Sequence, residues 1–180
     1  MKQDNYYQFT LVLKNVDEKT LHLEDSLYEA GCDDALINYR NGAVYLEFDR
    51  EASSLEDAVI SAIKNVRSTT IDADVASVAP ENLVTESEIA KRLDVSRQTI
   101  SLWIKGERRK NFPTPIMRLS EKSPLWKWDE VVIWLFENNI INDRQKLDHA
   151  LFFANINAAL GELDKKSRDM QHHLLERIAI

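Results

Sequence analysis

Several residue types that mark common protein classes are scarce in this chain of 180 residues. A single cysteine, Cys32, excludes an internal disulfide framework and a zinc site built from cysteines. Four glycines and four prolines are too few for low-complexity linkers. The longest uninterrupted apolar run, residues 131–136, is far shorter than the roughly 20 residues of a membrane-spanning helix. We therefore expect no membrane-spanning segment.

Targeting, metal and catalytic signals are also missing. The opening residues contain no apolar signal region, so we expect a cytoplasmic protein. His172 and His173 are adjacent rather than four apart on a helix, so they do not direct two imidazoles at one metal. Cys32 and His22 lack the companion residues of a nucleophilic site. We predict no metal site, no cofactor and no catalytic residue.

The charge of the chain is negative overall but uneven. The formal net charge of −7 argues against a non-specific nucleic-acid binder. Residues 1–83 contain 7 basic and 16 acidic residues, whereas residues 96–128 contain 8 basic and 2 acidic ones. A short basic block in an acidic chain indicates a local anion-binding surface. Charge alone leaves open the alternative that solvated charges cluster there by chance.

The chain up to Pro80 alternates between strand and helix patterns in the order β-α-β-β-α-β. Residues 7–14 place apolar side chains at every second position, which predicts a strand. The Asn41-Gly42 pair lies between two β-rich runs and predicts a tight hairpin, because both residues tolerate positive φ angles. We interpret Asp33 and Asp34 as turn residues rather than as an acid–base pair.

This order of elements is that of the ferredoxin-like split βαβ arrangement. We therefore predict an α+β protein that begins with an acidic ferredoxin-like domain at residues 1–82. The fold serves catalysts, sensors and docking modules alike, so it does not name a function. We expect this domain to bind a partner protein or a small effector, or to assist assembly.

Residues 85–104 have the pattern of a helix-turn-helix. Thr85-Glu-Ser-Glu88 is a capping box that begins the first helix, and Ser96 can cap the second. Asp94 stands where the turn needs a left-handed residue, which aspartate tolerates better than most residues. Two such helices can cross over one core only if five positions are apolar. Those positions are occupied by Ile89, Leu93, Val95, Ile100 and Trp103.

The outward face of the second helix suits the major groove of DNA. Arginine can pair with guanine, glutamine with adenine, and an apolar side chain can touch a thymine methyl group. The predicted base-contacting residues are Arg97, Gln98, Ser101, Leu102 and Lys105. Ser96 and Thr99 lie near the helix N-terminus, where short polar side chains can contact phosphate. The alternative is a helix-turn-helix that serves only protein docking. The outward face of its second helix would then be expected to be acidic or apolar, which is not the case here.

Three of the four prolines lie in residues 113–124, so the stretch after the second helix is not helical. It fits a hairpin of residues 116–119 with residues 125–128, followed by a helix that Asp129 caps and that continues to Phe136.

This run resembles the winged helix-turn-helix of phage excisionases and of the MerR superfamily. The matching pieces are Phe112-Pro-Thr-Pro115, Trp126-Lys-Trp128 and Trp134-Leu135, and the resemblance covers residues 83–137. It implies that the tip of the wing approaches the DNA backbone or the minor groove. The candidates there are Arg118, Lys122 and Lys127, while Arg108, Arg109 and Lys110 lie between helix and wing and can clamp phosphate. We expect the tryptophans to belong to the core.

The segment from residue 143 to residue 178 is predicted as one long helix that serves as a dimerisation arm. It has no proline and a single glycine. Its heptad seam consists of Ile156, Leu160, Leu163, Ser167, Met170, Leu174 and Arg177 or Ile178. Dimerisation is favoured because two-fold DNA sites need a two-fold protein. A helix packed on its own domain is the alternative.

Together these features predict a sequence-specific regulator of transcription that binds double-stranded DNA as a homodimer. The arrangement also resembles bacterial regulators in which a ferredoxin-like unit precedes such a winged module. One narrower hypothesis is an antitoxin whose acidic domain neutralises a toxin. An excisionase-like factor that bends DNA at recombination sites of a mobile element is the alternative. An enzyme with an accessory DNA-binding domain is a third class, for which the sequence contains no nucleophile, metal or nucleotide motif.

Overall fold

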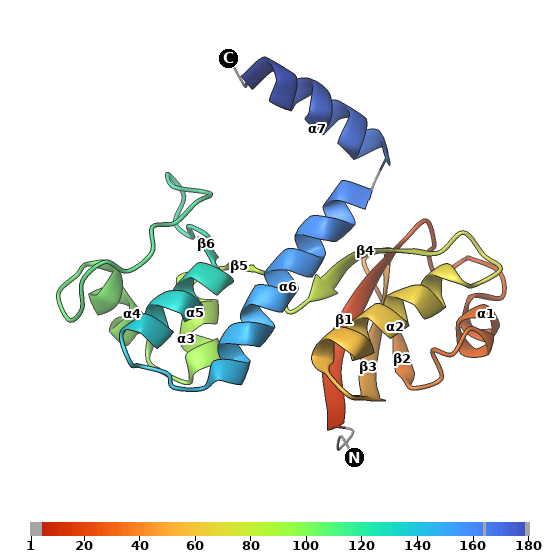
Figure 1. Cartoon of the computed structure of the whole chain (residues 1–180), viewed down its shortest axis with the longest axis horizontal. Coiled ribbons are helices and arrows are strands. Elements are labelled where there is room, and N and C mark those ends of the chain that lie inside the picture. The colour runs from red at the N-terminus through yellow and green to blue at the C-terminus, as the bar shows by residue number, and fades with distance from the viewer. Residues whose placement is uncertain (1–4, 164, 179–180) are drawn as a thin grey trace. The chain divides into compact units, whose positions relative to one another are not determined.

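The computed structural model describes residues 5–163 and 165–178, which form two compact units (Figure 1). The N-terminal unit comprises the chain up to Pro80 and the residues from Asn155 onward, and the central unit comprises Glu81–Ala154. The predicted α+β class is confirmed, because the described part contains seven helices and two antiparallel sheets. None of these helices has the length and apolar character needed to cross a membrane.

The N-terminal unit is built on a four-stranded antiparallel sheet with the strand order β2-β3-β1-β4. The strands are β1 (Asn5–Lys14), β2 (Ala35–Arg40), β3 (Ala43–Ala52) and β4 (Asp74–Ala79). Helix α1 (Leu23–Glu29) follows β1, and helix α2 (Leu55–Arg67) follows β3. Both helices pack on one face of the sheet (Figure 1).

Local sequence signals account for most of these elements. Phe9, Leu11 and Leu13 are buried on one face of β1, as their spacing predicted. Asn41 and Gly42 have φ angles of 51° and 80°, which confirms the tight hairpin between β2 and β3. Helix α2 buries a stripe that consists of Leu55, Ala58, Val59, Ala62, Ile63 and Val66.

A side chain closes the outer edge of β4. Asn157, on helix α6 (Arg144–Leu163), accepts the Val78 N–H at 2.7 Å and donates to the Val78 carbonyl at 2.8 Å. An edge strand otherwise presents unpaired backbone groups to solvent. The amide of Asn157 therefore takes the place of a neighbouring strand at this residue.

The central unit packs three short helices and the first part of α6 around one core. Its elements are β5 (Leu83–Val84), α3 (Glu86–Leu93), α4 (Arg97–Ile104), β6 (Trp126–Lys127) and α5 (Trp128–Glu137). Ile89, Ile100 and Leu135 are completely buried at its centre. Leu147 and Ala150 of α6 belong to the same core, so the central unit extends well beyond the predicted boundary at residue 137.

The region of the predicted wing differs from the expected hairpin. Met117 and Leu125 form a single antiparallel bridge, and β6 pairs with β5 instead of with residues 116–119. Strand β5 was not predicted, because two residues carry too little periodicity to be recognised.

The predicted cap of α5 is wrong. The N-cap residue is Lys127, and Asp129 lies in the first turn of the helix. Asn82 supplies the capping contacts instead. Its side-chain oxygen accepts the Asp129 N–H at 2.9 Å, and its side-chain nitrogen donates to the Asp129 carboxylate at 2.9 Å. A cap from outside the helix leaves no signal next to the helix in the sequence.

The predicted C-terminal helix is helical throughout its described residues from Arg144, as α6 up to Leu163 and as α7 (Lys165–Ile178), while residue 164 lies outside the described residues. Leu160 is buried and lines a small apolar cavity with Ile156 and with Ile63 of α2. This first part of the predicted seam therefore packs on its own unit, which was the alternative interpretation. The seam side chains of Leu163, Ser167 and Met170 lie outside the described residues.

Candidate nucleic-acid interface

Helix α3 begins at the predicted capping box. The Thr85 hydroxyl accepts the Glu88 N–H at 3.3 Å, and the Glu88 carboxylate accepts the Thr85 N–H at 2.6 Å. The hydrogen bond from the Thr85 N–H is the main reason why the pKa of Glu88 lies below its ordinary value. These contacts fix the start of the first helix of the pair.

The turn between α3 and α4 has the geometry that the sequence predicted. Asp94 is left-handed, with φ 53° and ψ 44°, and the Val95 N–H donates to the Ala90 carbonyl at 3.0 Å. The Ser96 hydroxyl then caps α4 by accepting the Thr99 N–H at 3.2 Å. A turn this short fixes the orientation of α4 relative to α3.

Helix α4 has one buried side and one solvent side. Ile100 and Trp103 face the core, with exposed fractions of 0% and 6%. The predicted base-contacting residues lie on the rest of the surface, where Arg97, Gln98 and Lys105 are exposed and Ser101 and Leu102 are half-buried.

Three of the predicted contact residues, Ser96, Arg97 and Thr99, have polar neighbours within the unit. The Arg97 guanidinium lies 3.7 Å from the Glu86 carboxylate, which is too long for a hydrogen bond. Its N–H donors therefore remain available to a ligand. The hydroxyls of Ser96 and Thr99 lie 2.9 Å apart and form one hydrogen bond with each other. A phosphate at this helix end would compete with that bond for the hydroxyl donor.

The cations after α4 fall into two groups. Arg109 donates to the Asn138 carbonyl at the end of α5, at 2.9 Å. Lys127 pairs with Glu130 at 3.2 Å, and Arg118 lies 4.0 Å from Glu121. Within the described part of the chain, four other predicted cations have exposed side chains that contact neither a carboxylate nor a backbone carbonyl. They are Lys105, Arg108, Lys110 and Lys122.

Aromatic residues anchor the loop that carries these cations. The Trp134 indole N–H donates to the Lys110 carbonyl at 3.1 Å, and the Trp126 indole N–H donates to the Pro113 carbonyl at 3.0 Å. Phe112 packs edge-on against Trp134, with ring centroids 4.9 Å apart. All four tryptophans are buried, which confirms that they belong to the core. The first part of this loop is thus held against α5 by Trp134 and against β6 by Trp126.

Arg92 is a structural residue of this unit that was not predicted. Its guanidinium lies 5.1 Å from the centre of the Trp128 ring and donates to the Glu81 carbonyl at 3.0 Å. Burial lowers the pKa of Arg92. The residue ties α3 to the segment before β5, and no local pattern in the sequence indicates this contact.

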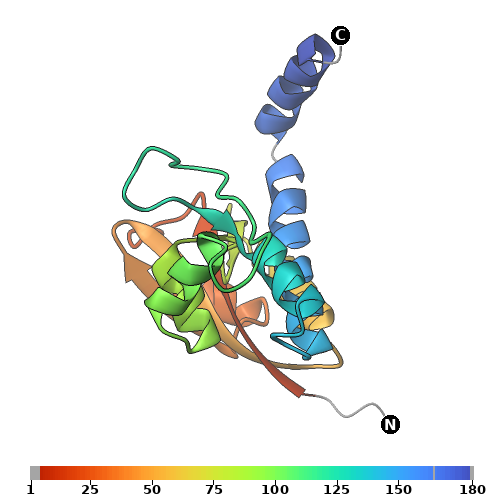
Figure 2. The ribbon, with the colours of Figure 1, turned by 90° about the vertical axis from the view of Figure 1, so that its left-hand side faces the viewer.

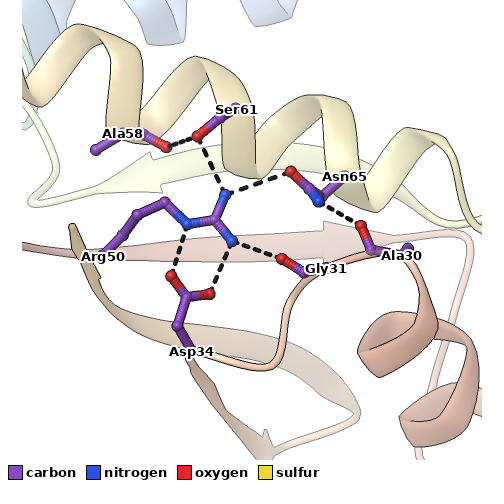
Figure 3. Close-up of polar contacts among 7 residues, drawn as sticks. All are labelled: Ala30, Gly31, Asp34, Arg50, Ala58, Ser61 and Asn65. Atoms are coloured by element: carbon purple, nitrogen blue, oxygen red, sulfur yellow. Dashed lines mark hydrogen bonds and ion pairs between the residues drawn. The ribbon is translucent and has the colours of Figure 1, made fainter. Parts of the chain in front are cut away.

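A second polar cluster lies in the N-terminal unit, where Arg50 is buried (Figure 3). Its five N–H donors all find acceptors. Two bonds of 2.7 Å go to the Asp34 carboxylate and one of 2.8 Å goes to the Gly31 carbonyl, while Ser61 and Asn65 of α2 accept the others. We interpret this cluster as a structural ion pair, because every donor is used within the fold.

Cys32 is buried beside this cluster. Burial raises the pKa of its thiol to about 11, so the group is protonated at neutral pH and is a poor nucleophile. In residues 5–163 and 165–178, no three histidine, cysteine or acidic side chains come together as a metal site would require.

Comparisons with protein families, with curated proteins and with solved structures give no match to this chain.

Proposed function

We propose that this protein is a sequence-specific regulator of transcription that binds double-stranded DNA. The observation that carries the proposal is the exposed face of α4. It presents Arg97, Gln98 and Lys105 to solvent, while Ile100 and Trp103 fix the opposite side in the core. A helix that follows a tight turn and presents these side chains suits the major groove.

The proposal includes a finer description of both units. The strand order β2-β3-β1-β4, with α1 and α2 on one face, supports a ferredoxin-like N-terminal unit. The α3–α4 pair, the β5–β6 pair and the Met117–Leu125 bridge support a winged helix-turn-helix with a small wing. In this description α4 reads bases, and Arg108, Lys110 and Lys122 contact phosphate.

We further propose that the protein acts as a homodimer in the cytoplasm, without a cofactor and without catalysis. The N-terminal unit is assigned to a partner protein or a small effector, because the chain up to Leu83 contains 16 acidic and 7 basic residues. An antitoxin that neutralises a toxin through this acidic unit is the narrower form of the proposal.

Selection of bound fragments from a random pool of duplexes tests the function directly. We expect the full chain to enrich one preferred sequence. Arg97→Ala should weaken binding to it by about 1–3 kcal/mol and relax the preference at one base pair. Arg144→Ala is the matched control, since Arg144 is an exposed arginine of the same unit on α6. An unchanged ranking of sites for Arg97→Ala would show that α4 does not read bases as proposed.

A second candidate function is a DNA-architecture factor of a mobile element. The observation that favours it is the row of exposed apolar residues in the wing, Ile116, Met117 and Leu119. Architectural proteins often bend DNA with apolar side chains. Expression from a promoter that carries the selected site separates the two candidates. A regulator changes that expression, whereas an architecture factor changes recombination between two such sites and leaves expression unchanged.

A further inference from the structure

The segment between α4 and β6 carries an exposed apolar row on the most basic part of the chain. Ile116, Met117 and Leu119 have exposed fractions of 42%, 49% and 68%. Single exposed apolar residues are common on protein surfaces. Three within four consecutive positions form a patch, which more often marks an interaction site.

The geometry of the loop places Leu119 in a turn close to a fixed base. Both views show the segment leaving the three short helices as a long loop (Figures 1 and 2). The Met117–Leu125 bridge closes this base, where the Leu125 N–H donates to the Met117 carbonyl at 3.0 Å. Beyond it, Arg118 is left-handed with φ 55°, and its carbonyl accepts the Glu121 N–H at 3.0 Å. Leu119 therefore lies inside a hydrogen-bonded turn, two residues after Met117, which the bridge to Leu125 holds in place.

The charge around this patch identifies the chemistry of its partner. Residues 96–128 contain 8 basic and 2 acidic residues, and the side chains of Arg118 and Lys122 are exposed beside Leu119. By contrast, the exposed Leu21 and Tyr28 of the N-terminal unit line a hollow with Asp25 and Glu29. An exposed apolar side chain among cations is complementary to a polyanion that also offers apolar surface. A DNA duplex with its stacked bases has both properties.

We propose that Leu119 is a wedge that enters the minor groove between two base pairs and kinks the duplex. Arg118 and Lys122 hold the phosphates on either side of the opened step. Apolar side chains that partly unstack a base step are a known physical means of bending DNA. This inference rests on the proposed function, since it requires that the central unit binds duplex DNA.

The wedge adds sequence preference without hydrogen bonds to bases. Steps such as TA unstack at a lower cost than other steps, so a site with such a step under the wing should bind better. The preferred sequence should therefore contain a flexible step outside the base pairs that α4 contacts.

The experiment measures bending and salt dependence on the same duplex. The full chain is bound to its selected site, with fluorophores at the two ends and 2-aminopurine at the flexible step. We expect closer ends and brighter 2-aminopurine on binding. Leu119→Ala should abolish both signals and weaken binding about tenfold, with the salt slope unchanged. Because Leu119 is exposed, the variant should keep the wild-type melting temperature.

Lys122→Ala is the matched control and should show the opposite pattern. Loss of one phosphate contact reduces the slope of log affinity against log salt by about one, whereas the bend remains. A wild-type complex with a straight duplex, or a Leu119→Ala complex bent like the wild type, would overturn the wedge. Loss of self-association in Leu119→Ala with an unchanged bend would overturn it too, and would assign the patch to a protein contact.

These outcomes are distinct from a failure of the proposed function. If the full chain selects no duplex sequence, the proposed function fails and the wedge fails with it. If Arg97→Ala changes the site preference while Leu119→Ala changes neither bend nor affinity, only the wedge fails.

Discussion

Arg50 illustrates how a single buried charge is accommodated in the N-terminal unit. A buried guanidinium is costly unless all of its donors are paired, and here five contacts pair them. Gly31 contributes its carbonyl in a left-handed conformation with φ 87°. A Cβ atom there would collide with the Asn65 side chain that also contacts Arg50. The contacts of Arg50 therefore require a glycine at position 31.

Replacing Arg50 by lysine should destabilise the N-terminal unit by about 2–3 kcal/mol, although the charge is kept. Lysine has three donors on one atom and cannot form the two parallel bonds to Asp34. Urea unfolding of the full chain measures the change. Arg40→Lys, at an exposed arginine of the same sheet, should change stability by less than about 0.5 kcal/mol. Equal effects of the two substitutions would contradict the structural role of the cluster.

The capping box of α3 predicts a stability difference that depends on pH. Glu88→Ala should cost about 1 kcal/mol at neutral pH, because the Thr85 N–H loses its acceptor. The pKa of Glu88 is lowered in the folded state, so its contribution is present above its ordinary value of 4.5. It is lost as the pH falls through the lowered value.

Thermal unfolding of wild type and variant from neutral to acid pH checks this expectation. The two melting temperatures should converge in acid. Ser87→Ala, at an exposed position of the same turn, should show no such convergence. A difference for Glu88→Ala that is constant with pH would mean that its charge does not stabilise the helix.

At the scale of whole elements, the sequence predicted those that carry their own signal. Strand β1 follows from its alternation, the β2–β3 hairpin from Asn41-Gly42, and the α3–α4 pair from its caps and apolar spacing. The solvent face of α4 was predictable for the same reason, because the helical period alone separates it from the core.

Elements and contacts that depend on distant residues were not predictable. Asn82 caps α5 across 47 residues, and Asn157 closes the edge of β4 across 79 residues. The bond from Arg109 to Asn138 removes one cation from the predicted clamp and also spans distant residues. Local periodicity contains no information about such pairs, so neither the cap nor the free cations could be derived from it.

The different burial of the apolar residues in α6 and α7 leads to a prediction about α7. Its described apolar residues Leu174, Leu175 and Ile178 are exposed, whereas Leu160 of α6 is buried in the N-terminal unit. A chain that ends at Leu163 should therefore keep both cores and lose the proposed dimer contact. Sedimentation equilibrium should show a monomer, and the footprint on a two-fold site should shrink to one half. A shortened chain that remains dimeric would place the contact elsewhere, for example at the β2 edge.

The whole molecule combines a basic surface with a strong negative charge elsewhere. The net charge is −7, whereas residues 81–154 contain 12 basic and 11 acidic residues. An acidic unit repels phosphate at distances up to about the Debye length, which is roughly 10 Å at 0.1 M salt. It should therefore lower non-specific binding without changing which bases α4 prefers.

A fragment of residues 81–154 should bind unrelated duplex more tightly than the full chain at low salt. The chain that ends at Leu163 is the matched control, because it also lacks α7 but keeps the acidic unit. The fragment should fold, since its core cluster is contained within it. Fluorescence anisotropy at about 0.05 M and about 0.3 M salt measures both affinities, and the difference should shrink at the higher salt. Both proteins should select the same half-site. If the fragment binds no tighter than its control at low salt, the acidic unit exerts no repulsion. If it selects a different sequence, that unit takes part in readout.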